Sequence, residues 1–331
     1  MLKKHTATAV SPAGSISKLS KIEKRNIKKK MIKRDLKMNK AVYLMVLPII
    51  LYYIIFSYIP MAGIVMAFKN YKPALGIFGS PWTDYYGFGN FIDFLQNPFF
   101  GRLMRNTITI SLYSLIFSFP APIILALVLS EIRFKRIKRT VQTISYFPHF
   151  ISTVVVCGLL TGFCLTDGLF NDLREMIGLN RESLLQVPKY FRTIYIGSGI
   201  WQGIGWSSIM YIAAIAGVDT QLYEAAALDG AGRFKRIWHI TLPGIKQTVI
   251  ILFILQMGKI LSVGSEKILL MYNESTYEVA DVISTYVYRK GLLDGSYSYS
   301  AAVSLFEAVI SFTLVFIVNK ISSKLSESSL F

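Results

Sequence analysis

Charged residues are scarce in this sequence: Asp, Glu, Lys and Arg together make up 17% of its 331 positions. Soluble globular chains carry about 25%, so too little charge is present to cover the surface of a water-soluble protein of this length. Hydrophobic residues reach 53% and gather in long blocks. Because a helix satisfies its own backbone hydrogen bonds in lipid, these blocks predict an all-α membrane protein. A soluble chain with an apolar core explains them less well.

Residues that form disulfides or bind metals are also few. Cys157 and Cys164 lie seven positions apart in one apolar segment, on the same face of a helix but too far apart for a disulfide. We expect them to be small buried hydrophobic residues. The three histidines, His5, His149 and His239, have no Cys or His neighbours at ligand spacing, so no metal site is predicted.

Motifs for catalysis and nucleotide binding are missing. The sequence contains no G-x-x-x-x-G-K-[ST], H-E-x-x-H or G-x-S-x-G and no aspartate-rich cluster. The glycines between Gly197 and Gly205 stand in an apolar helix, where small residues allow close helix packing. We therefore predict no catalytic residue and no cofactor in this chain, and an intramembrane enzyme is the least supported function. Any work it performs must draw on a partner or an ion gradient.

Six apolar blocks approach or exceed the roughly 20 residues that a helix needs to cross a bilayer. They are about Ala41–Phe68, Thr107–Ser130, Val141–Leu165, Thr193–Gly217, Thr248–Met271 and Ala301–Val318. The first block exceeds the apolar core of a signal peptide, so we expect it to remain as a membrane anchor.

Positive charge is concentrated at the N-terminus. Residues 1–40 hold many Lys and Arg but only two acidic residues, Glu23 and Asp35, and the formal net charge of the chain is +17. This tail has almost no aromatic residues to stack on bases and runs directly into an apolar block. It therefore predicts membrane topology and contact with anionic lipid, and no nucleic-acid binding.

The distribution of Lys and Arg also predicts an orientation. Basic residues are enriched in cytoplasmic loops, and most of the 36 in this chain lie in the N-terminal tail, loops 131–140 and 218–247, and the C-terminal tail. The three other loops, 69–106, 166–192 and 272–300, carry fewer. Both termini are therefore predicted to be cytoplasmic. Without the N-terminal tail the two sides are nearly equal, so the assignment depends on that tail.

Three regions follow from this pattern. Residues 1–40 form a basic cytoplasmic tail that we expect to be partly disordered, residues 41–320 a six-helix transmembrane domain, and residues 321–331 a short cytoplasmic tail. The long outer loop 69–106 is rich in aromatic residues, which suits a segment lying at the membrane surface or a contact for an external partner.

A polar stretch, EAAALDGAGRFKRIWHITLPGI, interrupts the apolar pattern between the fourth and fifth blocks. Asp219 and Thr220 are suitable N-cap residues, and residues 221–228 predict a short alanine-rich helix. Asp229-Gly230 should end it. We expect a second short helix over 232–239, after which Pro243 redirects the chain into the fifth block.

Two short helices joined at a glycine would form a rigid cytoplasmic projection. Its small alanine face would allow close approach by another protein, and Glu224 is placed to receive a cation from it. An amphipathic loop whose Arg233 and Lys235 meet lipid headgroups explains the composition equally well.

The same stretch resembles the EAA loop of bacterial ABC-importer permeases, whose pattern is E-A-A-x3-G-x9-I-x-L-P. The matching residues, with the spacing intact, are Glu224, Ala225, Ala226, Gly230, Ile240, Leu242 and Pro243. The six-block layout fits this family, so the resemblance extends from about residue 41 to the C-terminus.

Two further segments resemble the sugar permeases of this family. The run Gly89–Leu112 resembles the segment that leads into their second span. The run Glu266–Leu292 is similar to a branch associated with complex polysaccharides and oligosaccharides, although Lys267 stands where that branch commonly has Gln.

The resemblance implies the helical bundle of a type I ABC-importer permease in the bacterial cytoplasmic membrane. It also implies as partners a second homologous permease, two cytoplasmic ATPase subunits that bind ATP and Mg, an external solute-binding protein, membrane lipid and an oligosaccharide substrate. The 219–245 loop would couple to the ATPase. The coupling residues would be Glu224, Ala225, Ala226, Asp229, Gly230, Gly232 and Pro243.

Candidates for the substrate path come from the fourth and fifth blocks. Ionisable residues inside a membrane are functional candidates, and aromatic and amide side chains could bind sugars. The candidates are Trp201, Gln202, Trp206, Tyr211, Gln256, Lys259, Glu266 and Lys267. Helix packing explains the aromatic and amide residues equally well. Lys259 and Glu266 should share one helix face, and a structural ion pair or snorkelling of Lys267 would also account for the charges.

The two lysines suggest an acidic oligosaccharide as the substrate. A permease for peptides or other small solutes remains an alternative, because importers of many substrates share the EAA loop. From another class of function, a membrane receptor or scaffold that signals through its basic tail is the second alternative.

Overall fold

The computed structural model describes residues 29–31 and 34–326. The regular structure of this part is helical, and its β-type pairing is an isolated bridge between Lys69 and Trp82. Most of the predicted basic tail and residues 327–331 lie outside the described residues. The chain divides into two compact units, Met1–Gly63 and Ile64–Phe331, and each is described by itself.

The described part of the first unit is dominated by one helical run. It consists of α2 (Lys40–Tyr53), the π-helical η2 (Ile54–Tyr58) and α3 (Ile59–Met61), and continues through the 3-10 helix η3 (Ala62–Phe68). The whole run, Lys40–Phe68, is 29 residues long and apolar enough to span a membrane. It corresponds to the first predicted block.

The second unit contains two long helices, Pro188–Ala216 and Tyr297–Ser326, two long helical runs that each include a π-helical turn, and several shorter helices. Between residues 73 and 163 the elements are η4 (Pro73–Leu75), α4 (Gly76–Gly79), η5 (Tyr85–Gly87), α5 (Gly89–Leu95), α6 (Phe100–Tyr113), η6 (Ser114–Ser118), α7 (Pro120–Glu131), α8 (Lys135–Tyr146), η7 (Phe147–Phe150) and α9 (Thr153–Phe163). The middle of the unit is formed by α10 (Leu169–Met176), η8 (Leu184–Gln186), α11 (Pro188–Ala216), α12 (Thr220–Leu228), α13 (Arg233–Arg236), η9 (Ile237–Thr241) and α14 (Leu242–Met257). The last elements are α15 (Ser265–Met271), η10 (Glu274–Thr276), α16 (Tyr277–Ala280), α17 (Ile283–Tyr288), η11 (Arg289–Leu293) and α18 (Tyr297–Ser326).

In the described residues, four helices are long and apolar enough to span a membrane by length and composition. They are Lys40–Phe68, Phe100–Glu131, Arg233–Met257 and Tyr297–Lys324. They correspond to the first, second, fifth and sixth predicted blocks. The fourth block lies in α11, which is 29 residues long but less apolar than these four helices. It contacts α7, α8 and α14 and so packs against protein. Six spans remain a prediction.

The third predicted block is not one straight helix. Lys135–Phe150 and Thr153–Phe163 meet at an angle of 99° and count as at most one broken span. The bend follows Pro148, which lacks a backbone donor, and a new helix begins where the Ser152 hydroxyl accepts a hydrogen bond from the Val155 amide.

The fifth predicted block is also interrupted. Helix α14 ends at Met257, and α15 begins only at Ser265. Gly258 and Gly264 flank this break, at the C-cap and N-cap positions. The prediction that Lys259 and Glu266 share one helix face is therefore wrong, because they do not lie on one helix.

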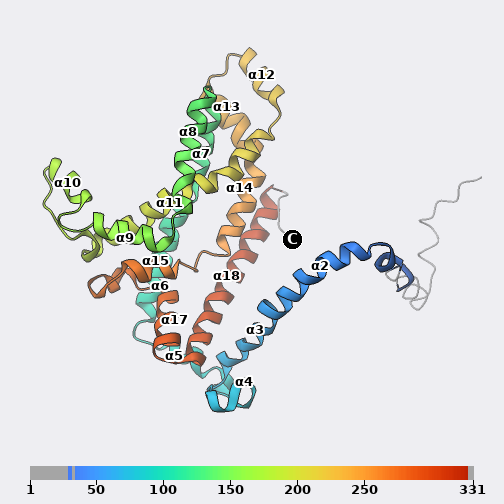
Figure 1. The fold of residues 1–331 in the computed structure, drawn as a ribbon, viewed down its shortest axis with the longest axis vertical. Helices are drawn as coiled ribbons and strands as arrows, with labels where there is room; N and C mark the ends of the chain where they lie inside the picture. Colours follow the sequence, from blue (N-terminus) through green and yellow to red (C-terminus); the bar gives the residue numbers. More distant parts are fainter. Residues whose placement is uncertain (1–28, 32–33, 327–331) are drawn as a thin grey trace, which may run out of the picture. The chain divides into compact units, whose positions relative to one another are not determined.

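Loops that were assigned to the same side of the membrane lie together in the second unit. The Asn106 amide donates to the carbonyls of Glu278 (2.9 Å) and Asp281 (3.0 Å), and the Asn273 amide donates to the Leu185 carbonyl (2.9 Å). At the other end, α8, α12 and α13 lie together (Figure 1), and Arg233 pairs with Glu131 at 3.9 Å. The two groups of loops thus occupy opposite ends, and the cytoplasmic assignment of one end stays a prediction.

Cys157 and Cys164 are free and buried. Both belong to an apolar cluster that α9 forms with α11, α15 and neighbouring loops. Their predicted role as small buried hydrophobic residues is confirmed.

Candidate functional site

The 219–245 loop begins with a short, well-capped helix. The Asp219 carboxylate accepts a hydrogen bond from the Gln221 amide at 2.9 Å, as an N-cap does. Helix α12 then runs to Leu228. The alanines at 225–227 favour this helix, since alanine has the highest helix propensity. Both the predicted N-cap and the predicted helix are confirmed.

Helix α12 ends in a Schellman motif. Gly230 has a φ of +72°, and its amide donates to the Ala227 carbonyl at 3.1 Å. The Ala231 amide donates to the Ala226 carbonyl at 2.8 Å. This 6→1 and 5→2 pattern requires a left-handed residue after Asp229, where glycine is least strained. The predicted break at Asp229-Gly230 is confirmed.

The second arm of the loop differs from the prediction. Residues 233–236 form α13, which continues through the π-helical η9 into α14, so that Arg233–Met257 is one helical run of 25 residues. Pro243 occupies the second position of α14 and does not redirect the chain. The π-helical turn just before it accommodates the missing proline donor.

The two arms of the loop are fastened together. The hydroxyls of Tyr223 in α12 and Thr241 in η9 form a hydrogen bond of 2.9 Å. Of the seven predicted coupling residues, all but the half-buried Ala226 are exposed. Leu228 and Phe234 are 91% and 89% exposed, so the loop presents an uncovered apolar surface beside its polar residues.

Four of the predicted substrate-path residues line one cavity of about 530 Å³. Trp206 and Tyr211 come from α11, Gln256 from the end of α14, and Lys259 from the segment that follows it. Gly199 and Gly203 line the same cavity. With Phe119, which also lines it, the cavity has three aromatic side chains, one amide and one ammonium group in its walls.

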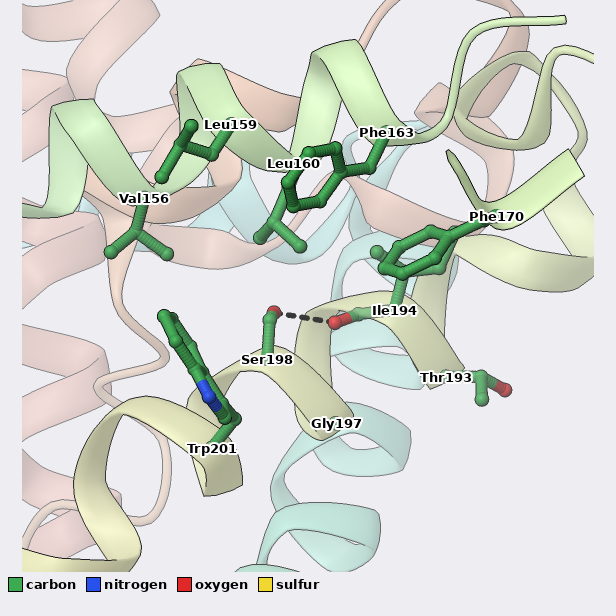
Figure 2. Close-up of a pocket in the computed structure, with 10 residues that line it drawn as sticks. All are labelled: Val156, Leu159, Leu160, Phe163, Phe170, Thr193, Ile194, Gly197, Ser198 and Trp201. Atoms are coloured by element: carbon green, nitrogen blue, oxygen red, sulfur yellow. Dashed lines mark hydrogen bonds between the residues drawn. The ribbon is translucent and has the colours of Figure 1, made fainter. Parts of the chain in front are cut away.

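The remaining aromatic and amide candidates lie elsewhere. Trp201 lines a separate cavity of about 450 Å³ between α9, α10 and α11. Figure 2 shows aliphatic and aromatic side chains around this space, with the Ser198 hydroxyl donating to the Ile194 carbonyl of its own helix. Gln202 donates to the Ile151 carbonyl at 3.0 Å and so fastens α11 to the bend before α9.

The two charged candidates of α15 have different environments. The Lys267 ammonium donates to the Tyr195 carbonyl at 3.1 Å and lies 5.1 Å from the centroid of the Tyr195 ring. Glu266 is exposed. Lys267 thus contributes to the packing of α15 on α11, whereas Lys259 is exposed in the cavity.

Two acidic residues escaped the sequence analysis. Glu307 in α18 is half-buried and accepts a hydrogen bond from the Ser262 hydroxyl at 3.2 Å. Because it is an ionisable residue inside the apolar block Ala301–Val318, the sequence could have identified it as a functional candidate. Asp281 is fully buried, but no local pattern marks it, because several of its partners lie far away in the sequence.

Asp281 is the centre of a polar network. It pairs with Arg289 at 2.7 Å and Arg102 at 3.3 Å, and it accepts a hydrogen bond from the Thr285 hydroxyl at 2.8 Å. Burial opposes the charge of Arg289, but the hydrogen bonds to Asp281 and Tyr272 outweigh it and raise the pKa of Arg289 above its usual value. The network joins α6 to the segment around α17, at the end of the unit opposite the 219–245 loop.

Comparison with known proteins reveals close relatives. The chain is 45% identical to the protein LplB of Bacillus subtilis (strain 168) over 297 residues, 89% of this chain and 92% of the relative. It is 42% identical to the polygalacturonan/rhamnogalacturonan transport system permease protein YteP of the same organism over 327 residues, 98% of this chain and 99% of the relative.

Solved structures are similar as well. One is a crystal structure of a bacterial ABC transporter involved in the import of the acidic polysaccharide alginate. It matches with a TM-score of 0.82 and 42% identity, covering 89% of this chain and 99% of the other. A second is a bacterial alginate ABC transporter in complex with an alginate pentasaccharide-bound periplasmic protein, with a TM-score of 0.82 over 90% of this chain and 99% of the other.

The family model for "binding-protein-dependent transport system inner membrane component" matches residues 118–327. This range includes the 219–245 loop and the cavity between α11 and α14. The chain belongs to the family of binding-protein-dependent transport system inner membrane components.

Proposed function

We propose that this permease translocates an acidic oligosaccharide, which an external solute-binding protein delivers, and that α12 couples it to cytoplasmic ATPases. The chain is a multi-pass protein of the cytoplasmic membrane and a permease of the oligosaccharide ABC-importer type. The complete transporter would contain a second homologous permease and two ATPase subunits. These subunits would bind ATP and Mg.

The observation that carries this proposal is the continuous helical run Arg233–Met257. It begins directly after the Schellman turn at Gly230 and ends one residue after Gln256, in the wall of the cavity. At 1.5 Å per residue it is roughly 37 Å long. A movement of the exposed loop would therefore displace the cavity wall, because a helix held by its own hydrogen bonds transmits motion as a rigid body.

The loop has the features that such coupling requires. The Tyr223–Thr241 hydrogen bond holds α12 against the start of the long helical run, so force applied to α12 reaches α14 without first bending the loop. Glu224 is exposed and free to meet a cation of the ATPase. Ala225 and Ala226 have short side chains, which permit close approach of the partner.

The acidic character of the substrate is supported by Lys259 and by the relatives. Lys259 is the cation among the side chains that line the cavity, which also include Trp206, Tyr211 and Gln256. An ammonium group forms strong charge-assisted hydrogen bonds with carboxylates. Polygalacturonan and alginate, named for the relatives, both consist of uronic acids. By analogy, the proposed substrate carries carboxylates too.

Uptake by the assembled transporter in proteoliposomes tests this proposal. Lys259→Gln should lower uptake of an oligogalacturonate by about tenfold while leaving uptake of the corresponding neutral oligosaccharide nearly unchanged, since one charge-assisted hydrogen bond contributes about 1.5–3 kcal/mol. Lys267→Gln is the matched control, because its ammonium group is engaged by Tyr195 and should affect both substrates equally. An unchanged ratio of acidic to neutral uptake in Lys259→Gln would rule out the role of Lys259. If neither sugar is transported by the parent, the proposed substrate class is wrong.

A further inference from the structure

A second surface feature is a groove where α7 ends and where α8 and α13 begin. Its volume is about 710 Å³, and the three helices meet at one end of the second unit (Figure 1). The groove is lined by Ile124, Leu127, Val128, Glu131, Ile132, Arg133, Phe134, Ile137, Arg233, Phe234 and Ile237. It includes the second arm of the 219–245 loop but none of the seven predicted coupling residues.

The walls of the groove are apolar and open. Ile124, Val128, Phe134 and Ile137 are all more than half exposed. Ile124 and Val128 lie one turn apart on α7, so an apolar surface leads along α7 toward the interior of the membrane domain. A groove of this kind suits a flexible hydrocarbon chain, which loses contact with water when it packs against these side chains.

The mouth of the groove carries positive charge. Arg133 and Arg233 line it, and Glu131 is the acidic residue there. Glu131 is 3.9 Å from Arg233, whose side chain remains 55% exposed, so this pair leaves Arg233 accessible. Among the described residues, Arg133 has no ion pair. One anion would therefore find two guanidinium groups with unused donors.

Helix α8 extends this positive surface. Lys135, Arg136, Lys138 and Arg139 lie in its first half, and its first turn contains no acidic residue. The helix dipole adds a partial positive charge at the same end. An anion held near the mouth of the groove would lower the repulsion among these groups.

The groove lies at the boundary between hydrocarbon and water. The apolar helical run Phe100–Glu131 ends in it, and the run Arg233–Met257 begins in it. Both runs are apolar enough to span a membrane, so their ends at the groove, with Arg133 and Arg233, would lie near the depth of the headgroups. A dissolved anion gains nothing from packing against the apolar walls, and a lipid without net charge gains less than an anionic lipid from the two arginines.

We propose that this groove binds an anionic phospholipid. Its phosphate lies between Arg133 and Arg233, and an acyl chain packs against Ile124, Val128 and Phe134. This site is separate from the proposed substrate cavity, and the proposal does not depend on which solute is transported.

Native mass spectrometry of the full chain, released from detergent, tests the proposal. The protein is incubated with equal amounts of phosphatidylglycerol and phosphatidylcholine that carry the same acyl chains. The parent should retain phosphatidylglycerol preferentially, and the Arg133→Gln/Arg233→Gln double variant should retain about tenfold less of it, since each basic residue near an anionic headgroup contributes to binding. The Glu131→Gln variant should retain more phosphatidylglycerol than the parent, because the substitution removes the acidic residue at the mouth of the groove.

Lys189→Gln/Lys290→Gln is the matched control. It changes the net charge by the same amount at the start of α11 and in η11, at the other end of the unit, and should bind phosphatidylglycerol as the parent does. Equal retention of the two lipids by the parent, or equal losses in the two double variants, would overturn the proposal. Displacement of the lipid by excess inorganic phosphate would also overturn it, because the site would then be one for a free anion.

A protein occupant is tested in the assembled transporter. A photoreactive benzophenone side chain in place of Phe134 should cross-link to phospholipid. If it cross-links to an ATPase subunit or to the second permease instead, the groove is a protein interface and the lipid proposal is wrong.

Discussion

Arg289 and Asp281 form a two-point ion pair in which Nη1 and Nη2 of the arginine donate to the two carboxylate oxygens at 2.9 and 2.7 Å. Asp281 is fully buried, and Arg102 of α6 also reaches it. One carboxylate thus holds together segments 179 positions apart in the sequence, at the end of the second unit opposite the 219–245 loop.

Loss of the buried carboxylate should destabilise this end of the protein. Asp281→Asn leaves Arg289 and Arg102 without their anionic partner, and removing one member of a buried pair costs about 3–5 kcal/mol. Thermal unfolding of the purified protein in detergent, followed by tryptophan fluorescence, should show a clear fall in Tm. Glu278→Gln is the control, because the Glu278 side chain is exposed. Equal Tm values for the two variants would contradict the structural role of Asp281.

The contribution of Arg289 to the stability of the protein should not change with pH in the neutral to alkaline range. Although burial opposes the charge, the hydrogen bonds to Asp281 and Tyr272 raise the pKa of Arg289 above its ordinary value. A group whose pKa is raised by folding stabilises the protein fully below its unfolded value and loses that effect only as the pH rises through the folded value. The difference in Tm between the parent and Arg289→Gln should therefore be the same at about pH 7 and about pH 9. A difference that shrinks over this range would mean that Arg289 does not carry the effect as a charged group.

Close packing of α11 on α8 should make one glycine irreplaceable. A Cβ atom at Gly205 would lie 2.1 Å from the Ser145 carbonyl oxygen and 2.8 Å from the Tyr146 nitrogen. Gly205→Ala must push the two helices apart, and overpacking of this kind costs about 1–3 kcal/mol. At Gly203 no atom lies within 4 Å of such a Cβ, so Gly203→Ala should unfold at the temperature of the parent. The assignment of the close contact fails if Gly205→Ala is as stable as Gly203→Ala.

Substitutions in the 219–245 loop should uncouple transport from ATP hydrolysis without removing the protein from the membrane. Gly230→Pro cannot adopt the φ of +72° found at Gly230, because proline fixes φ near −65°. Glu224→Ala removes the exposed anion. Both variants should lose most ATP-driven uptake in proteoliposomes while remaining at parental levels in the membrane fraction.

The control for the loop variants is Gln221→Ala. The Gln221 side chain is exposed in α12, and alanine favours the helix, so the local structure tolerates the change. Unchanged uptake in both Glu224→Ala and Gly230→Pro would show that the loop does not couple ATP hydrolysis to transport.

Local features of the 219–245 loop were predictable from the sequence. The N-cap at Asp219, the alanine-rich helix and the break at Gly230 all depend on residues within a few positions of one another, and short-range hydrogen bonds decide them. The course of the chain after Gly232 was not predictable in this way. A π-helical turn absorbs Pro243, and the arm that appeared to be a separate helix is the beginning of α14.

The substrate-path candidates show the same limit. Composition and apolar blocks selected eight residues, but neither could tell which of them face a common space. Trp206, Tyr211, Gln256 and Lys259 meet in one cavity because α14, which ends just before the break at Gly258, packs against α11. Lys267, beyond that break, is turned onto Tyr195 instead.

By itself, the sequence determined that the chain is helical and membrane-embedded, that it contains no G-x-x-x-x-G-K-[ST] motif, and that it carries a polar loop with a glycine-terminated helix. These properties depend on composition and on short-range patterns. Only the tertiary structure decided that the third block bends by 99°, that Asp281 pairs with Arg102 from a distant segment, and that Arg133 and Arg233 line one groove. Such contacts join residues far apart in the chain, and their free energy depends on burial that no local pattern encodes.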